Sequence, residues 1–339
     1  MTTGPQITLA HGGGGTMMQD FLHDVVLPRL HNPALDDLAD AAVLACPHGG
    51  ELAFTTDSFV VQPLFFPGGD IGHLAVCGTV NDLAVMGAKP AALSLACILE
   101  AGVPMDVVAR VMDSVKAAAA DAGVPVVTGD TKVVEKGQAD QMYLTTSGVG
   151  WRMPHAPAGW RSVQKGDAVI VSGSIGHHGV AVLAARAALP FTTPLSSDCA
   201  PLNGIVGLLL EAEREVRWMR DPTRGGLAAA LNELAVQAGV GIELDAAAVP
   251  LADDVKGAAE MLGLDPLYLA NEGRFVVVCP ASRADKAIAV LRSHPLGRGA
   301  ARIGTVTGPM PRGRVVMNTG FGGMRIVDMP SGEQLPRIC

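Results

Sequence analysis

The sequence predicts a two-domain protein of the α/β (α+β) class. Its 339 residues are more than one hydrophobic core usually serves. Hydrophobic residues make up 49% of the chain and charged residues 17%, which is a globular composition. Strand and helix patterns alternate in both halves, and a Pro/Gly-rich connection, "WRMPHAPAGW" at 151–160, separates them. We place the domain boundary in this connection.

The first half predicts an arm followed by a dense domain. Residues 1–40 are expected to form a glycine-rich arm, with "HGGGGT" at 11–16, and a helix around 17–30. In the domain at 41–151, "ELAFTTDSFVV" alternates and is β-branched, which predicts a strand. "HLAVCGTVNDLAVMGA" predicts a helix and "AALSLACILE" a strand. "PMDVVARVMDSVKAAAADAG" predicts a helix that stops at Gly123, and "VPVVTGDTKVV" and "QMYLTTSGVG" predict strands. The resulting β-α-β-α-β-β order is typical of a layered domain.

The second half repeats this alternation over 160–310. "DAVIVSGSIGHHG" predicts a strand that enters a glycine turn, and "RGGLAAALNELAVQAG" predicts a helix. "RFVVVCP" then predicts a strand and "SRADKAIAVLRSH" a helix. Residues 320–339 are expected to form a mobile tail that carries Cys339.

Charge and composition exclude several classes of function. The net charge is −8 and no Lys/Arg run occurs, which argues against nucleic-acid binding. No apolar run reaches the roughly 18 residues expected of a membrane span. The first residues lack the pattern of a signal peptide. The six cysteines form no CxxC pair, so we expect a reducing, cytoplasmic location.

Aspartates in turn-like or strand-end contexts are the first candidates for chemistry. Asp57, Asp82 and Asp130 stand beside small or hydroxyl residues, where other groups can approach. Carboxylates that converge from separate elements bind Mg²⁺, although a single Asp more often caps a helix or turn. The "TGDTK" stretch is more specific. Gly129 has no side chain and lets the backbone come close to a ligand. Asp130 can bind a metal, and Lys132 can reach a phosphate or move a proton.

Glycine-rich stretches predict anion binding. "RDPTRGG" at 220–226 opens a helix, so Asp221 or Thr223 can cap it, while the diglycine at the helix N-terminus can also bind an anion. Gly14 and Gly15 can close over phosphates, although a terminal glycine run is more often simply flexible. Neither a P-loop nor a dinucleotide-binding fingerprint occurs.

Two further residues stand out by their position. Glu272 lies in the Asn-Glu-Gly turn of "LANEG", where it is either an ordinary solvated polar side chain or a base held by a tight turn. Cys339 is the last residue, and it is either an accident of the terminus or a thiol carried on a flexible arm. The adjacent His177 and His178 make a poor metal pair because neighbouring side chains point in different directions.

Taken together, the motifs resemble a known family. "TDSF", "PLFFPGGDIGHLAVCGTVNDLAVMGA", "TGDTKVV", "RDPTRGG", "ANEG" and the terminal "PRIC" resemble the HypE family of hydrogenase maturation proteins over essentially the whole chain. The aspartate motifs are also similar to those of aminoimidazole ribonucleotide synthetase, selenophosphate synthetase and thiamine phosphate kinase. One position departs from the pattern: His177 stands where the family is expected to have Asp.

The resemblance implies a fold and a reaction. The fold is that of aminoimidazole ribonucleotide synthetase, with two domains, ATP between them, and N-terminal domains paired into a β-barrel-like homodimer. A partner carbamoyltransferase would load a carboxamide onto Cys339. This chain would then use ATP and Mg²⁺ to dehydrate it to a thiocyanate. The cyano group would pass to iron in a partner maturation complex and become a cyanide ligand of [NiFe] hydrogenase.

The resemblance also suggests residue roles. Glu272 and Lys132 are the expected proton movers, with Cys339 as the carrier. The expected Mg²⁺ ligands are Asp57, Asp82, Asp130 and Asp221. The expected nucleotide contacts are Gly14, Gly15, Asn81, Gly129, Lys132 and Thr223. Two alternatives stay open: a synthetase or kinase of the same fold acting on a small molecule, and a non-enzymatic iron chaperone that uses Cys339 and would bind metal without ATP turnover.

Overall fold

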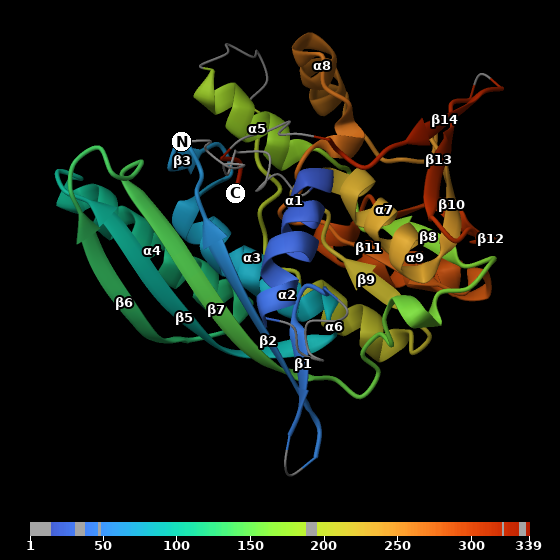
Figure 1. The fold of residues 1–339 in the computed structure, drawn as a ribbon, viewed down its shortest axis with the longest axis horizontal. Helices are drawn as coiled ribbons and strands as arrows, with labels where there is room; N and C mark the ends of the chain where they lie inside the picture. Colours follow the sequence, from blue (N-terminus) through green and yellow to red (C-terminus); the bar gives the residue numbers. More distant parts are fainter. Residues whose placement is uncertain (1–14, 31–37, 47–48, 188–194, 321, 332–336) are drawn as a thin grey trace.

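Two β-sheets, one in each half of the chain, organise the protein (Figure 1). The computed structural model describes residues 15–30, 38–46, 49–187, 195–320, 322–331 and 337–339. A five-stranded sheet has the order β1-β2-β7-β5-β6, and a seven-stranded sheet has the order β14-β13-β10-β12-β8-β11-β9. The two-domain mixed fold predicted from the sequence is confirmed.

The first sheet is built from strands whose side chains alternate between two faces. Its strands are β1 (Ala42–Ala45), β2 (Glu51–Phe59), β5 (Ala88–Glu100), β6 (Val126–Val134) and β7 (Met142–Arg152). Along β2, Ala53, Thr55 and Phe59 are buried, whereas the residues between them are more exposed. The buried face packs on helix α3 (Ile71–Val85). Most residues of α3 are buried, because helix α6 (Asn203–Ala212) of the second domain also contacts it.

Within the first sheet, β5 and β6 pair in parallel, and helix α4 (Met105–Ala122) connects them. Val111 and Val115 of this helix face the core, as their four-residue spacing predicts. Gly123 ends the helix in the left-handed conformation, with φ of 66°. The short strands β3 (Phe65–Phe66) and β4 (Gly69–Asp70) form a ribbon ahead of α3.

The second sheet lies between two layers of helices. Its strands are β8 (Ala168–Val171), β9 (Trp218–Arg220), β10 (Val240–Asp245), β11 (Val276–Cys279), β12 (Ala301–Pro309), β13 (Arg314–Asn318) and β14 (Met324–Val327). Helix α7 (Gly226–Ala238) packs on one face, and helices α6 (Asn203–Ala212) and α9 (Ala284–Ser293) pack on the other. Strand β8 is therefore buried on both faces, and its sequence "AVIV" is apolar throughout.

The remaining helices lie at the periphery of these layers. They are α1 (Thr16–Phe21), a π-helical turn η2 (Leu22–Val26), α2 (Leu27–Leu30), α5 (His177–Arg186) and α8 (Asp253–Leu262). Single 3₁₀ turns occur at η3 (Trp160–Ser162), η4 (Pro266–Tyr268), η5 (Ala281–Arg283) and η6 (Pro295–Gly297). Among the residues described, no helix is both long enough and apolar enough to cross a membrane.

The predicted tail needs a new boundary. Within the range 320–339, residues 324–327 form strand β14, which pairs antiparallel with β13 and buries Val327. These residues thus belong to the second sheet, because their backbone and one side chain complete its edge. A tail can begin only after Val327.

Candidate functional site

The C-terminus is docked between the two domains rather than extended into solvent (Figure 1). Ile338 is only 2% exposed and packs in the core cluster that includes Phe59, Ile71 and Leu144. The carbonyl of Cys339 accepts a hydrogen bond from the Val60 amide at 3.3 Å. The last residues thus pair with the backbone that follows β2, and this holds the thiol at a defined place.

Arg337 anchors the docked segment. Its carbonyl accepts from the Gln62 amide at 3.3 Å and from the Arg186 guanidinium at 2.6 Å. Its own guanidinium binds Asp140 at 2.6 Å and the Gln62 side chain at 3.2 Å. Arg337 therefore fastens the tail to both domains, because Gln62 and Asp140 belong to the first domain and Arg186 to the second.

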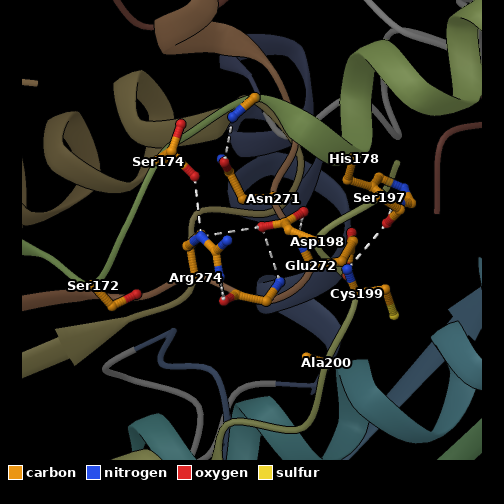
Figure 2. Close-up of polar contacts among 12 residues, drawn as sticks. Ser172, Ser174, His178, Ser197, Asp198, Cys199, Ala200, Asn271, Glu272 and Arg274 are labelled. Atoms are coloured by element: carbon orange, nitrogen blue, oxygen red, sulfur yellow. Dashed lines mark hydrogen bonds and ion pairs between the residues drawn. The ribbon is translucent and has the colours of Figure 1, made fainter. Parts of the chain in front are cut away.

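His178 is a site residue that the sequence analysis left without a role. Its Nε2 lies 2.7 Å from the Ile338 carbonyl and therefore donates to it. Its Nδ1 lies 2.8 Å from the Oγ of Ser197, and both residues are labelled in Figure 2. Ser197 Oγ in turn accepts from the Cys199 amide. Burial lowers the pKa of His178, so the ring is neutral, with one donor for the tail and one acceptor for the serine. The adjacent histidine pair in a glycine turn was the only sequence signal.

The electrostatic surroundings keep the Cys339 thiol protonated. Burial raises the pKa of this thiol, and the carboxyl groups of Glu272 and Asp57 raise it further. Arg224 acts in the opposite direction, and its own pKa is raised chiefly by Cys339. The docked tail thus presents a neutral sulfur among a guanidinium and several carboxyl groups.

Three carboxyl groups from separate elements meet beside this position. Oxygen atoms of Asp40, Asp82 and Asp221 all lie within 4.8 Å of one another. Asp40 precedes β1, Asp82 belongs to α3, and Asp221 follows β9. The Thr55 hydroxyl lies 2.8 Å from Asp82 Oδ2 and 2.9 Å from the Asp40 carbonyl, which ties β2 to the group.

The pKa values of this cluster show that it is short of positive charge. Burial raises the pKa of Asp221 to about 8, and burial together with the neighbouring Asp221 raises that of Asp82 well above its usual range. Arg220, at 3.0 Å from Asp40 and 3.1 Å from Glu233, supplies only part of the compensation. Hard oxygen donors at this spacing fit Mg²⁺, which would stabilise the ionised carboxylates.

The expected metal ligands divide into two groups: Asp57, Asp82 and Asp221 lie in or beside the carboxylate cluster, and Asp130 lies outside it. Asp82 and Asp221 lie in the cluster, and Asp57 is near enough to raise the pKa of both. The cluster also contains Asp40, which the sequence did not single out because nothing distinguishes it from the other aspartates of "LDDLAD".

Asp130 and Lys132 do not join the cluster within one chain. They bind each other at 2.7 Å on β6, with side chains 61% and 71% exposed. Asp130 pairs across the sheet with Ala96, which pairs with Thr145. Thr145 contacts Ser58, the neighbour of Asp57, and successive side chains of a strand point to opposite faces. Asp130 therefore faces away from α3, whereas Asp57 faces it.

Glu272 lies at the centre of the site in a rigid turn. Its side chain is 2% exposed, and its Oε1 has no hydrogen-bond partner among the residues described. Burial, and then Asp221, raise its pKa well above the usual range. Asp198 accepts from the Glu272 and Gly273 amides at 3.2 and 3.3 Å and lies 3.8 Å from Arg274 Nε (Figure 2). A buried carboxyl group in such a turn suits proton transfer.

Asn81 joins the two domains. Its amide donates to the Ala200 carbonyl at 3.2 Å and to the Glu272 carbonyl at 3.0 Å, and it accepts from the Leu202 amide at 2.8 Å. Both N–H donors of the side chain are therefore engaged by protein. Asn81 holds the Glu272 turn against α3, and it has no free donor for a nucleotide.

The other expected nucleotide contacts are spread over the molecule. Gly15 lies against the Pro330 carbonyl, which leaves no room for a Cβ, while Gly14 lies outside the described residues. Gly129 lies on β6 against Leu95, so it belongs to the sheet. Thr223 lines a cavity of about 430 Å³ together with Arg220, Arg224 and Trp160.

Comparison with known proteins agrees with the motifs and the fold. Residues 38–151 match the N-terminal domain of AIR synthase related proteins, and residues 164–315 match the C-terminal domain. Carbamoyl dehydratase HypE of Azotobacter vinelandii is 49% identical over 98% of this chain and 97% of that protein. The protein of the same name from Escherichia coli (strain K12) is 43% identical over 98% and 99%.

Solved structures lead to the same group. A HypE in complex with ATP is 46% identical over 98% of this chain and all of its own, with a TM-score of 0.82. The crystal structure of a HypE-HypF complex matches at 44% identity and a TM-score of 0.86, over 91% of this chain and 99% of that one. Aquifex aeolicus thiamine monophosphate kinase, at 19% identity, shares the fold alone. The chain therefore belongs to the carbamoyl dehydratase HypE family, within the AIR synthase related proteins.

Proposed function

We propose that the protein dehydrates a carboxamide carried on its own Cys339 thiol to a thiocyanate, at the expense of ATP. The observation that carries this proposal is the docking of Cys339 beside Glu272 and Arg224, next to the Asp40, Asp82 and Asp221 cluster. The names of the relatives, carbamoyl dehydratase, and the ATP complex of a 46% identical HypE support it. The thiocyanate would supply the cyanide ligand of [NiFe] hydrogenase.

The proposed reaction balances without any other reagent. The carboxamide oxygen attacks the γ-phosphoryl group of ATP and releases ADP. The nitrogen gives up one proton to Glu272 as the oxygen is phosphorylated. Its second proton leaves with the phosphate, which carries that oxygen away, and the carbon–nitrogen bond becomes triple. Phosphorylation is needed because the oxygen of an amide is a poor leaving group, and positioning with charge stabilisation is how proteins promote such a transfer.

In its ionised form, which Arg224 favours, Glu272 is the proposed acceptor of one proton from the nitrogen. Its buried Oε1 has no partner among the described residues, and its carbonyl and amide are fixed by Asn81 and Asp198. Lys132, the other expected proton mover, is exposed on β6 and has no such position within one chain. Bound Mg²⁺ would neutralise charge on the phosphates. Asp40, Asp82 and Asp221 would hold it, with Asp57 beside them.

The protonated state of the docked thiol separates loading from dehydration. A thiolate is the nucleophile in sulfur chemistry, and burial disfavours it at this position. We therefore propose that a carbamoyltransferase loads Cys339 when the tail is undocked, in line with the HypE-HypF complex formed by a relative. The neutral carboxamide then suits the buried position, and the cyano group passes to an iron-carrying complex in the cytoplasm.

We also propose that the protein forms a homodimer through the outer face of its first sheet. Phe54, Ile98 and Trp151 point away from α3 on this face and are 42%, 41% and 57% exposed. Strand β6 is an exposed edge, which invites pairing with another chain. If Asp130 and Lys132 take part in the chemistry, they would reach it from a second copy.

The two alternatives fit the site less well. A small-molecule kinase or synthetase of this fold needs an open substrate position, whereas here the chain's own terminus lies beside Glu272 and Arg224. An iron chaperone would leave the carboxyl groups of Asp40, Asp82 and Asp221 without a role, although Asp221 is among the groups that act on the Cys339 thiol.

Intact mass measurement tests the proposal. The protein is incubated with carbamoyl phosphate, ATP and the carbamoyltransferase, and the C-terminal peptide is followed with time. We expect a carboxamide on Cys339 and then loss of the mass of one water, with one ADP formed per loss. The Cys339→Ala variant should show neither step, while Cys97→Ala should behave as wild type. ADP formation without change at Cys339 would favour the small-molecule enzyme, and iron binding without ADP would favour the chaperone.

A further inference from the structure

A second cluster of reactive side chains, outside the carboxylate site, involves two thiols and an imidazole. One ring nitrogen of His73 and the sulfurs of Cys77 and Cys199 all lie within 4.8 Å of one another. His73 and Cys77 are one turn apart on α3, so they lie on the same side of the helix. Cys199 comes from the segment that precedes α6, in the second domain. Both cysteines are buried and carry free thiols.

The cluster differs from an ordinary group of core cysteines in its charge state. The pKa of Cys77 is lowered to about 6 by its hydrogen bond to Cys199 and its contact with His73, against the effect of burial. The same contact with Cys77 raises the pKa of Cys199 and that of His73. Cys97 lies in the same hydrophobic cluster, and burial raises its pKa. The Cys77 proton can therefore pass to His73, which leaves a thiolate beside an imidazolium with the number of protons unchanged.

We propose that His73, Cys77 and Cys199 form a binding site for a soft divalent cation, with Zn²⁺ as the best fit. Thiolate and imidazole are the donors that zinc prefers, and three protein ligands leave one position for a fourth. Two thiolates and a neutral imidazole around a divalent cation carry no net charge, which suits a buried place. Hard cations such as Mg²⁺ prefer the oxygen donors of the Asp40 cluster.

A cation here would join the two domains next to the site. Helix α3 carries Asn81 and Asp82 a little more than one turn after Cys77. The segment with Cys199 carries Ser197, which contacts His178, and Asp198, which holds the Glu272 turn. Cation binding would therefore join the segment that contacts His178 through Ser197 to helix α3, which supplies Asp82 to the carboxylate cluster.

Direct metal binding tests the proposal without reference to catalysis. The full-length protein is stripped with a chelator, reduced without oxygen, and titrated with Zn²⁺ against a chromophoric competitor. Co²⁺ serves as a spectroscopic probe, because thiolate ligands give it a charge-transfer band. We expect one strong site per chain, thiolate bands with Co²⁺, and a rise in Tm on adding Zn²⁺.

Variants locate the site. Cys77→Ser and Cys199→Ser should each lose more affinity than the roughly 10–100-fold that loss of an outer-shell partner costs. His73→Gln should do the same and is the safer variant, because its ring is only partly buried. The matched controls are Cys97→Ser and Cys339→Ala. Cys97 is a buried thiol of the same hydrophobic core that does not belong to the group of His73, Cys77 and Cys199, and Cys339→Ala removes the tail thiol. Both should bind Zn²⁺ as wild type does.

Three outcomes would overturn the proposal. The first is equal Zn²⁺ affinity in wild type and in all cluster variants. The second is loss of binding in Cys339→Ala alone, which would place the metal on the tail. The third is a Cys77–Cys199 disulfide in protein purified and kept without oxygen, which would make the pair a redox element instead.

Discussion

Shortening Ile338 to alanine is expected to undock the C-terminal tail while the rest of the protein stays folded. The Ile338 side chain is 2% exposed and packs in the core cluster with Phe59, Ile71 and Leu144. The substitution leaves the backbone unchanged, so the bond from His178 to the Ile338 carbonyl can still form. The effect therefore isolates the apolar part of docking.

The size of the effect follows from the buried area. Full burial of an isoleucine side chain is worth about 1.5–3 kcal/mol, and alanine keeps a part of it. A loss of about 2 kcal/mol changes the ratio of docked to undocked tail by about 30-fold, since about 1.4 kcal/mol corresponds to a factor of ten. Tm should change little, because the docked end is a terminal segment that can leave without opening either sheet.

Alkylation of Cys339 measures this ratio. A docked thiol is buried and protonated, so a thiol reagent such as iodoacetamide reacts mainly with the undocked tail. The rate at the C-terminal peptide, followed by mass spectrometry, should rise by about 30-fold in Ile338→Ala. Met324→Ala, whose side chain is 53% exposed on β14, should leave the rate unchanged. An unchanged rate in Ile338→Ala at equal Tm would refute the idea that this side chain holds the tail.

Three further predictions concern the carboxyl groups. Asp82→Asn should lower Mg²⁺-dependent ATP turnover by more than about 100-fold while the exposed Asp106→Asn does not, and equal turnover in both would remove Asp82 from the metal site. Without Mg²⁺, the folded-state pKa of Asp221, about 8, exceeds its unfolded value, so the native state binds the extra proton and stability falls as pH rises from about 4 to 8. Asp221→Asn should flatten this fall in denaturant unfolding, and an unchanged slope would contradict the shift. Glu272→Gln should accept the carboxamide on Cys339 but dehydrate it about 10²–10⁴-fold more slowly in single-turnover mass measurements, unless its role is structural.

Local sequence patterns were enough to predict most elements. The four-residue spacing of Val111 and Val115 and the stop at Gly123 define α4, and both are properties of a helix by itself. The alternation in "ELAFTTDSFVV" likewise predicts β2 and its buried face. The joint set of motifs, down to the terminal Cys339, was enough to predict the family.

The sequence predicted the site only in part, because convergence of distant residues depends on register. Asp57 and Asp130 both lie on strands of one sheet, yet the pairing through β7 and β5 puts them on opposite faces. A shift of one residue would reverse this, and "VVTGDTKVV" has no alternation of apolar and polar residues that would assign Asp130 to a face. The sequence therefore could not show that Asp130 and Lys132 stand apart from the cluster within one chain.

Docking of the two domains decided the rest. Asp40 looked like part of an arm until β1 and Arg220 positioned it, and Asn81 looked like a nucleotide contact until Glu272 and Leu202 engaged its amide. His178 acquired its role only because the terminus folds back onto it. The sequence by itself determined most of the elements and the family, and it singled out Cys339 as the candidate carrier. The tertiary structure decided which polar groups face one another, because such contacts join segments more than a hundred residues apart, and their partners follow from packing rather than from neighbouring residues.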